Sequence, residues 1–158
     1  MISIPQFKTL EEAEIYIRAA IIEALNNEVL QVIQLEEAKQ INDLVYGAKA
    51  YSPRLYERRW DMSDTNNMVG NVKGLSLSVE NVTPPSDYVS PILANRCKPP
   101  TLNKNLSEVV EYGEGYDWYS PGARPFTQAT VEALKKNKKH IKAIKKKLRS
   151  KGIVVAYK

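Results

Sequence analysis

A helical apolar repeat in the first third of the chain limits the fold more than any other feature. Thr9 followed by Glu12 is the signature of a capping box, which predicts that a helix begins there. Apolar residues then recur on one helical face, at Leu10, Ala13, Ile17, Ile21 and Ala24. A second set lies nearly opposite, at Ile15, Ala19 and Ile22. One stripe is enough to dock a surface helix, so the second indicates either a helix sandwiched in the core or one that also meets another subunit.

A second helix is expected from about Glu28 to Tyr46, after a break at Asn26-Asn27. Its best-ordered apolar face consists of Ala38, Ile41, Leu44, Val45 and Ala48. Residues 1–48 are therefore predicted to be mainly helical. The pattern leaves open whether residues 10–46 form one bent helix or two.

The middle of the chain has a different character, which begins at Tyr51-Ser52-Pro53 because Pro53 disfavours helical backbone at Ser52. Residues 75–80 alternate as in a half-buried strand, and residues 68–73 are a weaker partner strand, with Lys73-Gly74 as the turn. Residues 83–105 contain five prolines and no periodicity. Loops of this length are usually functional, and an extended arm over a neighbouring subunit is expected.

The last part of the chain is predicted to be helical again. A short helix from Leu106 to Tyr112 should stop at Gly113. A final helical region is predicted over residues 127–151, either continuous or broken near Asn137. Gly152 is a suitable C-cap, and residues 153–157 are expected to form a last strand. The predicted class is α+β in a single domain, 1–158, with long N-terminal helices, a small antiparallel or mixed sheet, a long Pro-rich loop and a basic C-terminal helix.

The net charge of +5 conceals a strong asymmetry. Residues 1–48 carry eight acids and three bases, whereas residues 133–158 carry eleven bases and no acid. Opposite charge at the two ends would let neighbouring copies attract head to tail. The lysines of 135–151 have three interpretations, which are a solvated face, contact with an acidic partner surface, and contact with DNA phosphates. The residues expected to make electrostatic contacts are Lys142, Lys145 and Lys146.

The residues suited to catalysis or metal binding are few. The chain has one cysteine, Cys97, and one histidine, His140, which lies among lysines and is expected to be solvated. Glu36-Glu37 is interpreted as a solvated helix face, and Glu108 and Glu111 share a face without a nearby nucleophile. We therefore expect no catalytic residue, no cofactor and no metal, and predict that the protein is not an enzyme. No stretch approaches the ~20 apolar residues of a membrane span, and no signal peptide is recognised, so synthesis in the cytoplasm is expected.

A series of short motifs follows the N-terminal helices in a distinctive order. Tyr51-Ser52-Pro53 leads to Tyr56 and Arg58-Arg59, and the strand pair ends in Glu80-Asn81-Val82. Val110-Glu111-Tyr112-Gly113 and then Ala123-Arg124-Pro125-Phe126 come before the last helix. Over about residues 44–150 this series resembles the phage neck and tail-completion (head–tail joining) proteins, especially those of phages of Gram-positive bacteria. One departure is that Arg58-Arg59 runs into Trp60-Asp61-Met62, where family members often have Gly-x-Leu.

The resemblance implies a ring of six or twelve identical copies in the virion neck, assembled in the host cytoplasm. The ring would join a connector or head-completion protein to a tail terminator or tail tube protein, and DNA would pass through its lumen without being read. By the same resemblance, Glu111 and Gly113 would end the short helix, and Arg124-Pro125-Phe126 would anchor the last helix. The alternative is a DNA-binding or packaging-associated protein that uses the lysines of 135–151.

Some of these residues also have roles that their side-chain chemistry predicts. Phe126 is a candidate core residue, and Arg124 is placed to reach a carboxylate such as Glu111. An aromatic and arginine cluster of the kind enriched at interfaces comprises Tyr51, Tyr56, Arg58, Arg59 and Trp60. The alternative for this cluster is that the aromatic rings pack internally while the arginines stay in solvent.

Overall fold

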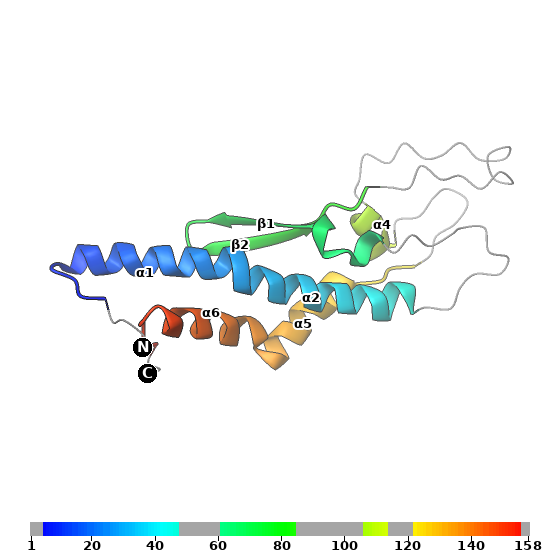
Figure 1. The fold of residues 1–158 in the computed structure, drawn as a ribbon. Helices are drawn as coiled ribbons and strands as arrows, with labels where there is room; N and C mark the ends of the chain where they lie inside the picture. Colours follow the sequence, from blue (N-terminus) through cyan, green and yellow to red (C-terminus); the bar gives the residue numbers. More distant parts are fainter. Residues whose placement is uncertain (1–4, 48–60, 85–105, 114–121, 156–158) are drawn as a thin grey trace, which may run out of the picture.

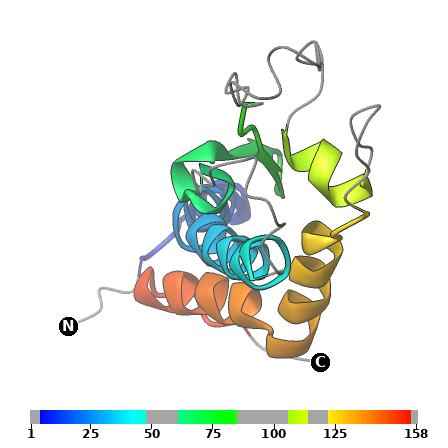
Figure 2. The same ribbon diagram turned by 90° about the vertical axis from the view of Figure 1, so that its right-hand side faces the viewer.

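The computed structural model describes residues 5–47, 61–84, 106–113 and 122–155. These residues form an elongated molecule in which a long helix runs beneath a β-hairpin (Figure 1). Seen end-on, the long helix lies between the hairpin on one side and two C-terminal helices on the other (Figure 2). The α+β class is confirmed. The aromatic and arginine cluster, Tyr51 to Trp60, and the Pro-rich loop from residue 85 onward lie outside the described residues.

The N-terminal region is one continuous helical rod. It comprises α1 (Leu10–Ala24), a π-helical segment (Leu25–Val29), α2 (Leu30–Ile41) and a second π-helical segment (Asn42–Tyr46). Thr9 Oγ1 accepts a hydrogen bond from the Glu12 N–H at 3.2 Å, which confirms the predicted start. The predicted break at Asn26-Asn27 is wrong. Both asparagine side chains donate to carbonyl groups one turn earlier, of Ile22 and Glu23, and the wider π turn absorbs the residues without ending the helix.

The sheet is a two-stranded antiparallel hairpin, β1 (Met68–Lys73) and β2 (Ser76–Asn81). Two short 3₁₀ helices, Asp61–Ser63 and Thr65–Asn67, lead into it. Gly74 takes a φ of 61° in the turn, close to where the sequence placed it. Burial alternates along both strands, so Met68, Val72 and Val79 face the long helix while their neighbours face outward. A Cβ atom on Gly70 would lie 2.7 Å from Leu30 Cδ1, so glycine permits this close approach.

The C-terminal half supplies α4 (Leu106–Tyr112), α5 (Phe126–Asn137) and α6 (Lys139–Ser150). The expected break near Asn137 is confirmed, because Lys138 adopts a left-handed conformation with a φ of 53°. Gly152 caps α6 at a φ of 77°, and the Ile153 N–H donates to the Leu148 carbonyl at 2.9 Å. The predicted last strand is wrong for residues 153–155, which have no strand structure. The cap uses the Ile153 N–H and turns the chain back on its helix.

The best-buried side chains gather where α2, α5 and the base of the hairpin meet. They are Ile41, Val45, Met62, Met68 and Phe126. Two residues of the apolar face predicted for α2, Ile41 and Val45, are confirmed in the core, whereas Leu44 is 39% exposed. At the other end of the rod, α1 buries Ala20 and Ala24 but leaves Leu10 and Ile15 exposed. Thus α1 is not sandwiched in a core, since α6 lies along one side and the hairpin covers only its later part (Figure 1).

Candidate interaction surfaces

The α4–α5 junction brings together the motif residues that the sequence singled out. The carboxylate of Glu111, in α4, accepts hydrogen bonds from the backbone N–H groups of Thr127 at 2.9 Å and Gln128 at 3.4 Å. The first N–H groups of a helix have no partner within that helix, and Pro125 at the N-cap position provides no side-chain hydrogen bond. A side chain from a different helix therefore caps α5.

The predicted ion pair between Arg124 and Glu111 is wrong, because each of these side chains has a different hydrogen-bond partner. Arg124 Nη1 donates to the Val45 carbonyl at 3.3 Å, and its backbone N–H donates to the Val110 carbonyl at 3.0 Å. The arginine thus links the segment before α5 to the second π-helical segment and to α4. The favourable charge near Glu111 comes from the N-terminus of α5.

Gly113 and Phe126 complete this junction. Gly113 ends α4 with a φ of 67°, and a Cβ atom there would lie 2.3 Å from the backbone nitrogen of Ala123. Only glycine fits both the conformation and the close contact. Phe126 is 1% exposed and packs in the core. All these motif residues therefore act by holding α4, α5 and α2 together.

A buried polar network, which the sequence interpretation missed, joins the end of β2 to α4. The Asn81 side chain donates to the Met62 carbonyl at 2.9 Å and accepts from the Thr83 hydroxyl at 2.6 Å. The Ser107 hydroxyl donates to the Asn81 carbonyl at 2.6 Å. The only signal in the sequence was the position of Asn81 at the end of an alternating strand, where a buried amide must find partners.

The interpretation of Glu36-Glu37 as a solvated face is wrong, since both residues are about 5% exposed. Their side chains diverge by about 100° around α2, and each enters a different interface. Glu36 accepts hydrogen bonds from Asn137 and Lys139, both at 3.1 Å, under the C-terminal helices. Burial tends to raise its pKa, but hydrogen bonds from Lys139 and Gln40 hold the pKa below its ordinary value.

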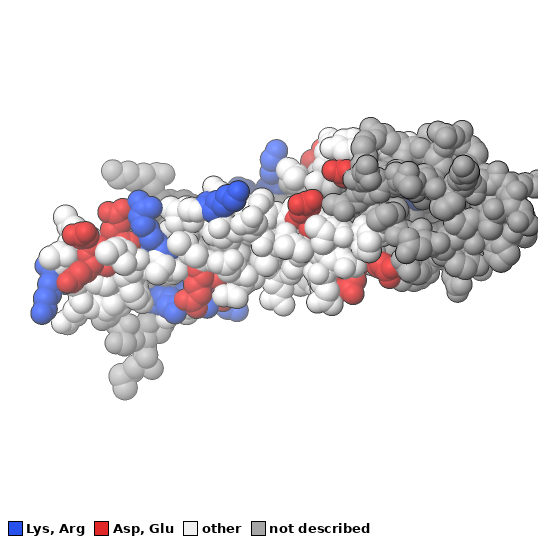
Figure 3. Space-filling view, turned by 90° about the horizontal axis from the view of Figure 1, so that it is seen from above, with Lys and Arg blue, Asp and Glu red and all other residues white. Residues whose placement is uncertain are grey.

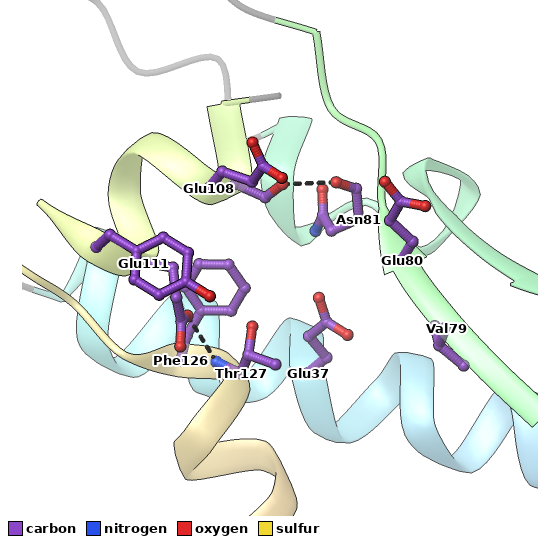
Figure 4. A pocket seen from close by; sticks show the side chains of 10 residues that line it. Glu37, Val79, Glu80, Asn81, Glu108, Glu111, Phe126 and Thr127 are labelled. Carbon is purple, nitrogen blue, oxygen red and sulfur yellow. Dashed lines mark hydrogen bonds between the residues drawn. The ribbon is translucent and has the colours of Figure 1, made fainter. Parts of the chain in front are cut away.

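Glu37 points the other way, into a hollow of about 180 Å³ between β2, α4 and the start of α5 (Figure 4). Burial raises the pKa of this carboxyl, against a hydrogen bond with Asn81, and the nearby charge of Glu111 raises it further. Four of the ten residues that line the hollow are glutamates, namely Glu37, Glu80, Glu108 and Glu111. Within the described residues no group of three or more acids, histidines or cysteines is arranged to bind a metal ion.

The basic helix α6 finds its first partner within its own chain. Lys147 Nζ lies 2.9 Å from a carboxylate oxygen of Glu23 and 2.9 Å from one of Glu28. Lys151 also pairs with Glu23, and the Tyr16 hydroxyl donates to the Lys151 carbonyl at 3.0 Å. Hydrogen bonds from Lys147 and Lys151 lower the pKa of Glu23, and those to Glu28 and Glu23 raise the pKa of Lys147. Part of the charge asymmetry is thus neutralised where α6 packs on the acidic helix.

The three lysines predicted to make electrostatic contacts lie elsewhere on α6. Lys142 and Lys146 are exposed, and Lys145 is half-buried. Seen from the hairpin side, the described surface mixes acidic and basic side chains without a large patch of one sign (Figure 3). His140 differs from the prediction of full solvation, because it is half-buried and its Nδ1 is buried without a hydrogen-bond partner in the part of the chain described.

An apolar groove follows the exposed side of α1 and reaches the tip of the hairpin. It has a volume of about 430 Å³ and is lined by Leu10, Ala13, Glu14, Ile17, Arg18, Ile21 and Leu75. Leu10 is 90% exposed and Leu75 is 46% exposed. Four residues of the first apolar stripe predicted from the sequence, Leu10, Ala13, Ile17 and Ile21, therefore line an open groove, whereas the fifth, Ala24, is buried.

The chain matches the family model YomN over residues 9–150. The chain belongs to the YomN family. This is a phage-derived family typified by a protein of a Bacillus prophage, so the phage origin expected from the sequence is supported. No curated protein and no solved structure shows a significant match. Among the described helices of this YomN protein, none combines the length and apolar character needed to cross a membrane.

Proposed function

We propose that this YomN-family protein is a non-catalytic structural subunit of the phage head–tail junction. Copies of the chain would form a ring, of six or twelve, in the virion neck, assembled in the host cytoplasm. The ring would join a connector or head-completion protein to a tail terminator or tail tube protein, with DNA passing through the lumen unread. The phage-derived family supports the general setting, and the more specific role is our inference.

The observation behind the proposal is the α4–α5 junction. The motif residues that resemble head–tail joining proteins, Glu111, Gly113 and Phe126, form one interlocked structural unit. Such a unit fixes how α4 and α5 are joined to the long helix, which suits a protomer that repeats in a ring.

The alternative, a DNA-binding or packaging-associated protein, receives less support. Lys139, Lys147 and Lys151 bind carboxylates of their own chain and are therefore poorly placed to contact phosphates. Lys142 and Lys146 stay exposed. DNA affinity that falls steeply with salt and disappears on neutralising Lys142, Lys145 and Lys146 would favour this alternative.

The head–tail proposal can be tested in the phage that encodes the chain. Disruption of this gene should yield DNA-filled heads and separate tails in electron micrographs of lysates, and supply of the intact chain from a plasmid should restore joined particles. Antibody labelling should mark the neck. Normal infectious particles without the chain, or label on the capsid or tail tip, would refute the proposal.

A further inference from the structure

The hairpin is a sheet of two strands, and among the described residues no further strand pairs with either edge. Exposed strand edges tend to pair with other chains unless prolines, bulges or charges prevent it. Neither strand contains a proline, and each carries a single charged side chain, Lys73 in β1 and Glu80 in β2. The hairpin is therefore weakly protected against added strands.

The ladder geometry shows which backbone groups point outward. The Val82 N–H donates to the Asn67 carbonyl at 2.8 Å, and the register pairs Lys73 with Ser76 across the turn. Hydrogen-bonded pairs alternate along an antiparallel ladder, so residues 69, 71 and 73 bond across the hairpin. The N–H and C=O groups of Gly70 and Val72 in β1, and of Leu77 and Val79 in β2, point away from it.

The outward backbone groups have hydrogen-bond partners at the base of the hairpin but none within the described part of the chain near its tip. At the base, the Met68 carbonyl accepts from Gln34 Nε2 at 2.8 Å, and the Asn81 carbonyl accepts from the Ser107 hydroxyl at 2.6 Å. Nearer the tip, the outward groups of Gly70, Val72, Leu77 and Val79 have no hydrogen-bond partner among the described residues. The open stretch is thus two outward residues long on each edge.

We infer that β1 of one copy pairs with β2 of the next, so that the hairpins of neighbouring subunits form one continuous antiparallel sheet. This inference rests on the proposed ring. Subunits related by rotation about a ring axis present their hairpins in the same direction, and β1 beside the next copy's β2 is then antiparallel. Because the contact joins two different edges, it repeats around a ring instead of stopping at a dimer.

The β1 edge of one copy and the β2 edge of the next are complementary in their side chains as well as in their backbone groups. In the same register as the internal ladder, Val72 would lie beside the next copy's Leu77 on the inner, apolar face, and Gly70 beside its Val79. On the outer face, Asn71 would lie beside Ser78. No like charges would meet, since Lys73 would face Ser76 and Glu80 would face Val69. A second copy is therefore a suitable occupant of each edge.

Disulfide trapping tests the pairing directly. In a Cys97→Ser background, Asn71→Cys protein is mixed with Ser78→Cys protein, because these positions would form a non-hydrogen-bonded pair between copies. The mixture should give a mixed disulfide dimer under mild oxidation, whereas neither variant alone should do so readily. Ser78→Cys mixed with Val131→Cys, exposed on α5, measures random collision. A mixture that crosslinks no faster than this control would overturn the inference.

A backbone variant provides a second, independent test. Val72→Pro removes one outward N–H that the internal ladder does not use, whereas Val72→Ala shortens the same side chain and keeps the N–H. Sedimentation at high protein concentration should show assembly for the wild type and Val72→Ala, and loss of assembly for Val72→Pro. Circular dichroism should show that the proline variant still folds. Equal assembly of both variants, or a wild type that stays monomeric throughout, would contradict the strand pairing.

Failure of the inference and failure of the proposed function are distinguishable. Neck labelling without the 71–78 crosslink would keep the head–tail role and remove the strand pairing. The crosslink in a protein that labels another part of the particle would keep the pairing and remove the role.

Discussion

The long helix is held in place by different interactions at its two ends, by core packing at one end and by surface ion pairs at the other. At the core end, where α4 and α5 meet α2 (Figure 1), Phe126, Ile41 and Met62 are at most 2% exposed. At the α1 end, Lys147 and Lys151 bind glutamates at the surface, while Leu10 and Ile15 are 90% and 62% exposed. The core end buries its apolar side chains within the chain, whereas the α1 end keeps apolar surface that a neighbouring chain can bury.

The strongest test of this contrast removes the largest buried ring. Phe126→Ala should destabilise the protein by about 3–5 kcal/mol, because it leaves a cavity in the core. Val131→Ala, on an exposed position of the same helix, should change the free energy of unfolding by less than about 0.5 kcal/mol. Urea denaturation of both variants checks the prediction, and similar losses would mean that the core is not concentrated at this end.

A second test compares two glycines with the same backbone conformation. Gly113→Ala should cost about 2 kcal/mol or more, because φ is positive and the new Cβ atom would meet the Ala123 backbone. Gly74→Ala at the hairpin tip has a similar φ and nothing within 4 Å, so it should cost about 1 kcal/mol. Thermal unfolding measures the difference. Equal costs would show that α4 can shift away from α5 without penalty.

Glu37→Gln separates the buried charge from the packing around it. The variant should be more stable than wild type near neutral pH, by about 1 kcal/mol, because it removes a carboxylate from a buried site. Burial raises the pKa of Glu37 above 4.5, so the charge destabilises the fold above the raised pKa and the cost disappears as pH falls towards 4.5. Denaturation curves at several pH values should show the advantage shrinking in acid. An advantage that does not depend on pH would contradict this explanation.

The smallest effect is expected at the α1 end. Lys147→Met should lower the unfolding temperature slightly at low salt, and the loss should fade in high salt because exposed ion pairs are screened. The pKa of Glu23 is lowered from 4.5, so the stability from this pair is present above pH 4.5 and lost as pH falls further. Lys142→Met, at an exposed position of the same helix, is the control. Equal loss in both variants would show that the contact with Glu23 and Glu28 is unimportant.

Local signals in the sequence predicted most of the elements. The Thr9 and Glu12 pair located the start of α1, the alternation of residues 75–80 located β2, and Gly113 located the end of α4. The asparagine pair at 26–27 predicted a helix break that is absent, because a π turn accommodates residues that usually end a helix. Residues 153–155 were wrongly predicted as a strand, because the C-cap of α6 uses the Ile153 N–H, which donates to the Leu148 carbonyl.

The candidate surfaces were less predictable than the elements. The motif around Glu111, Gly113 and Phe126 could be selected as important, but its hydrogen bonds depend on how α4 meets α5. Glu37 and Asn81 were missed, because the burial of a polar side chain is decided by distant segments. The open edges of the hairpin also follow from what packs beside it, and a strand pattern gives no information about its neighbours.

The sequence by itself determined where α1 begins, where α4 and α6 end, which strand face is apolar, and that opposite charges occupy the two ends of the chain, because each depends on residues a few positions apart. The tertiary structure decided that the basic helix binds its own acidic helix, that Glu36 and Glu37 are buried, and that the hairpin edges stay open. These properties depend on contacts between segments far apart in the chain, and local spacing does not encode those contacts.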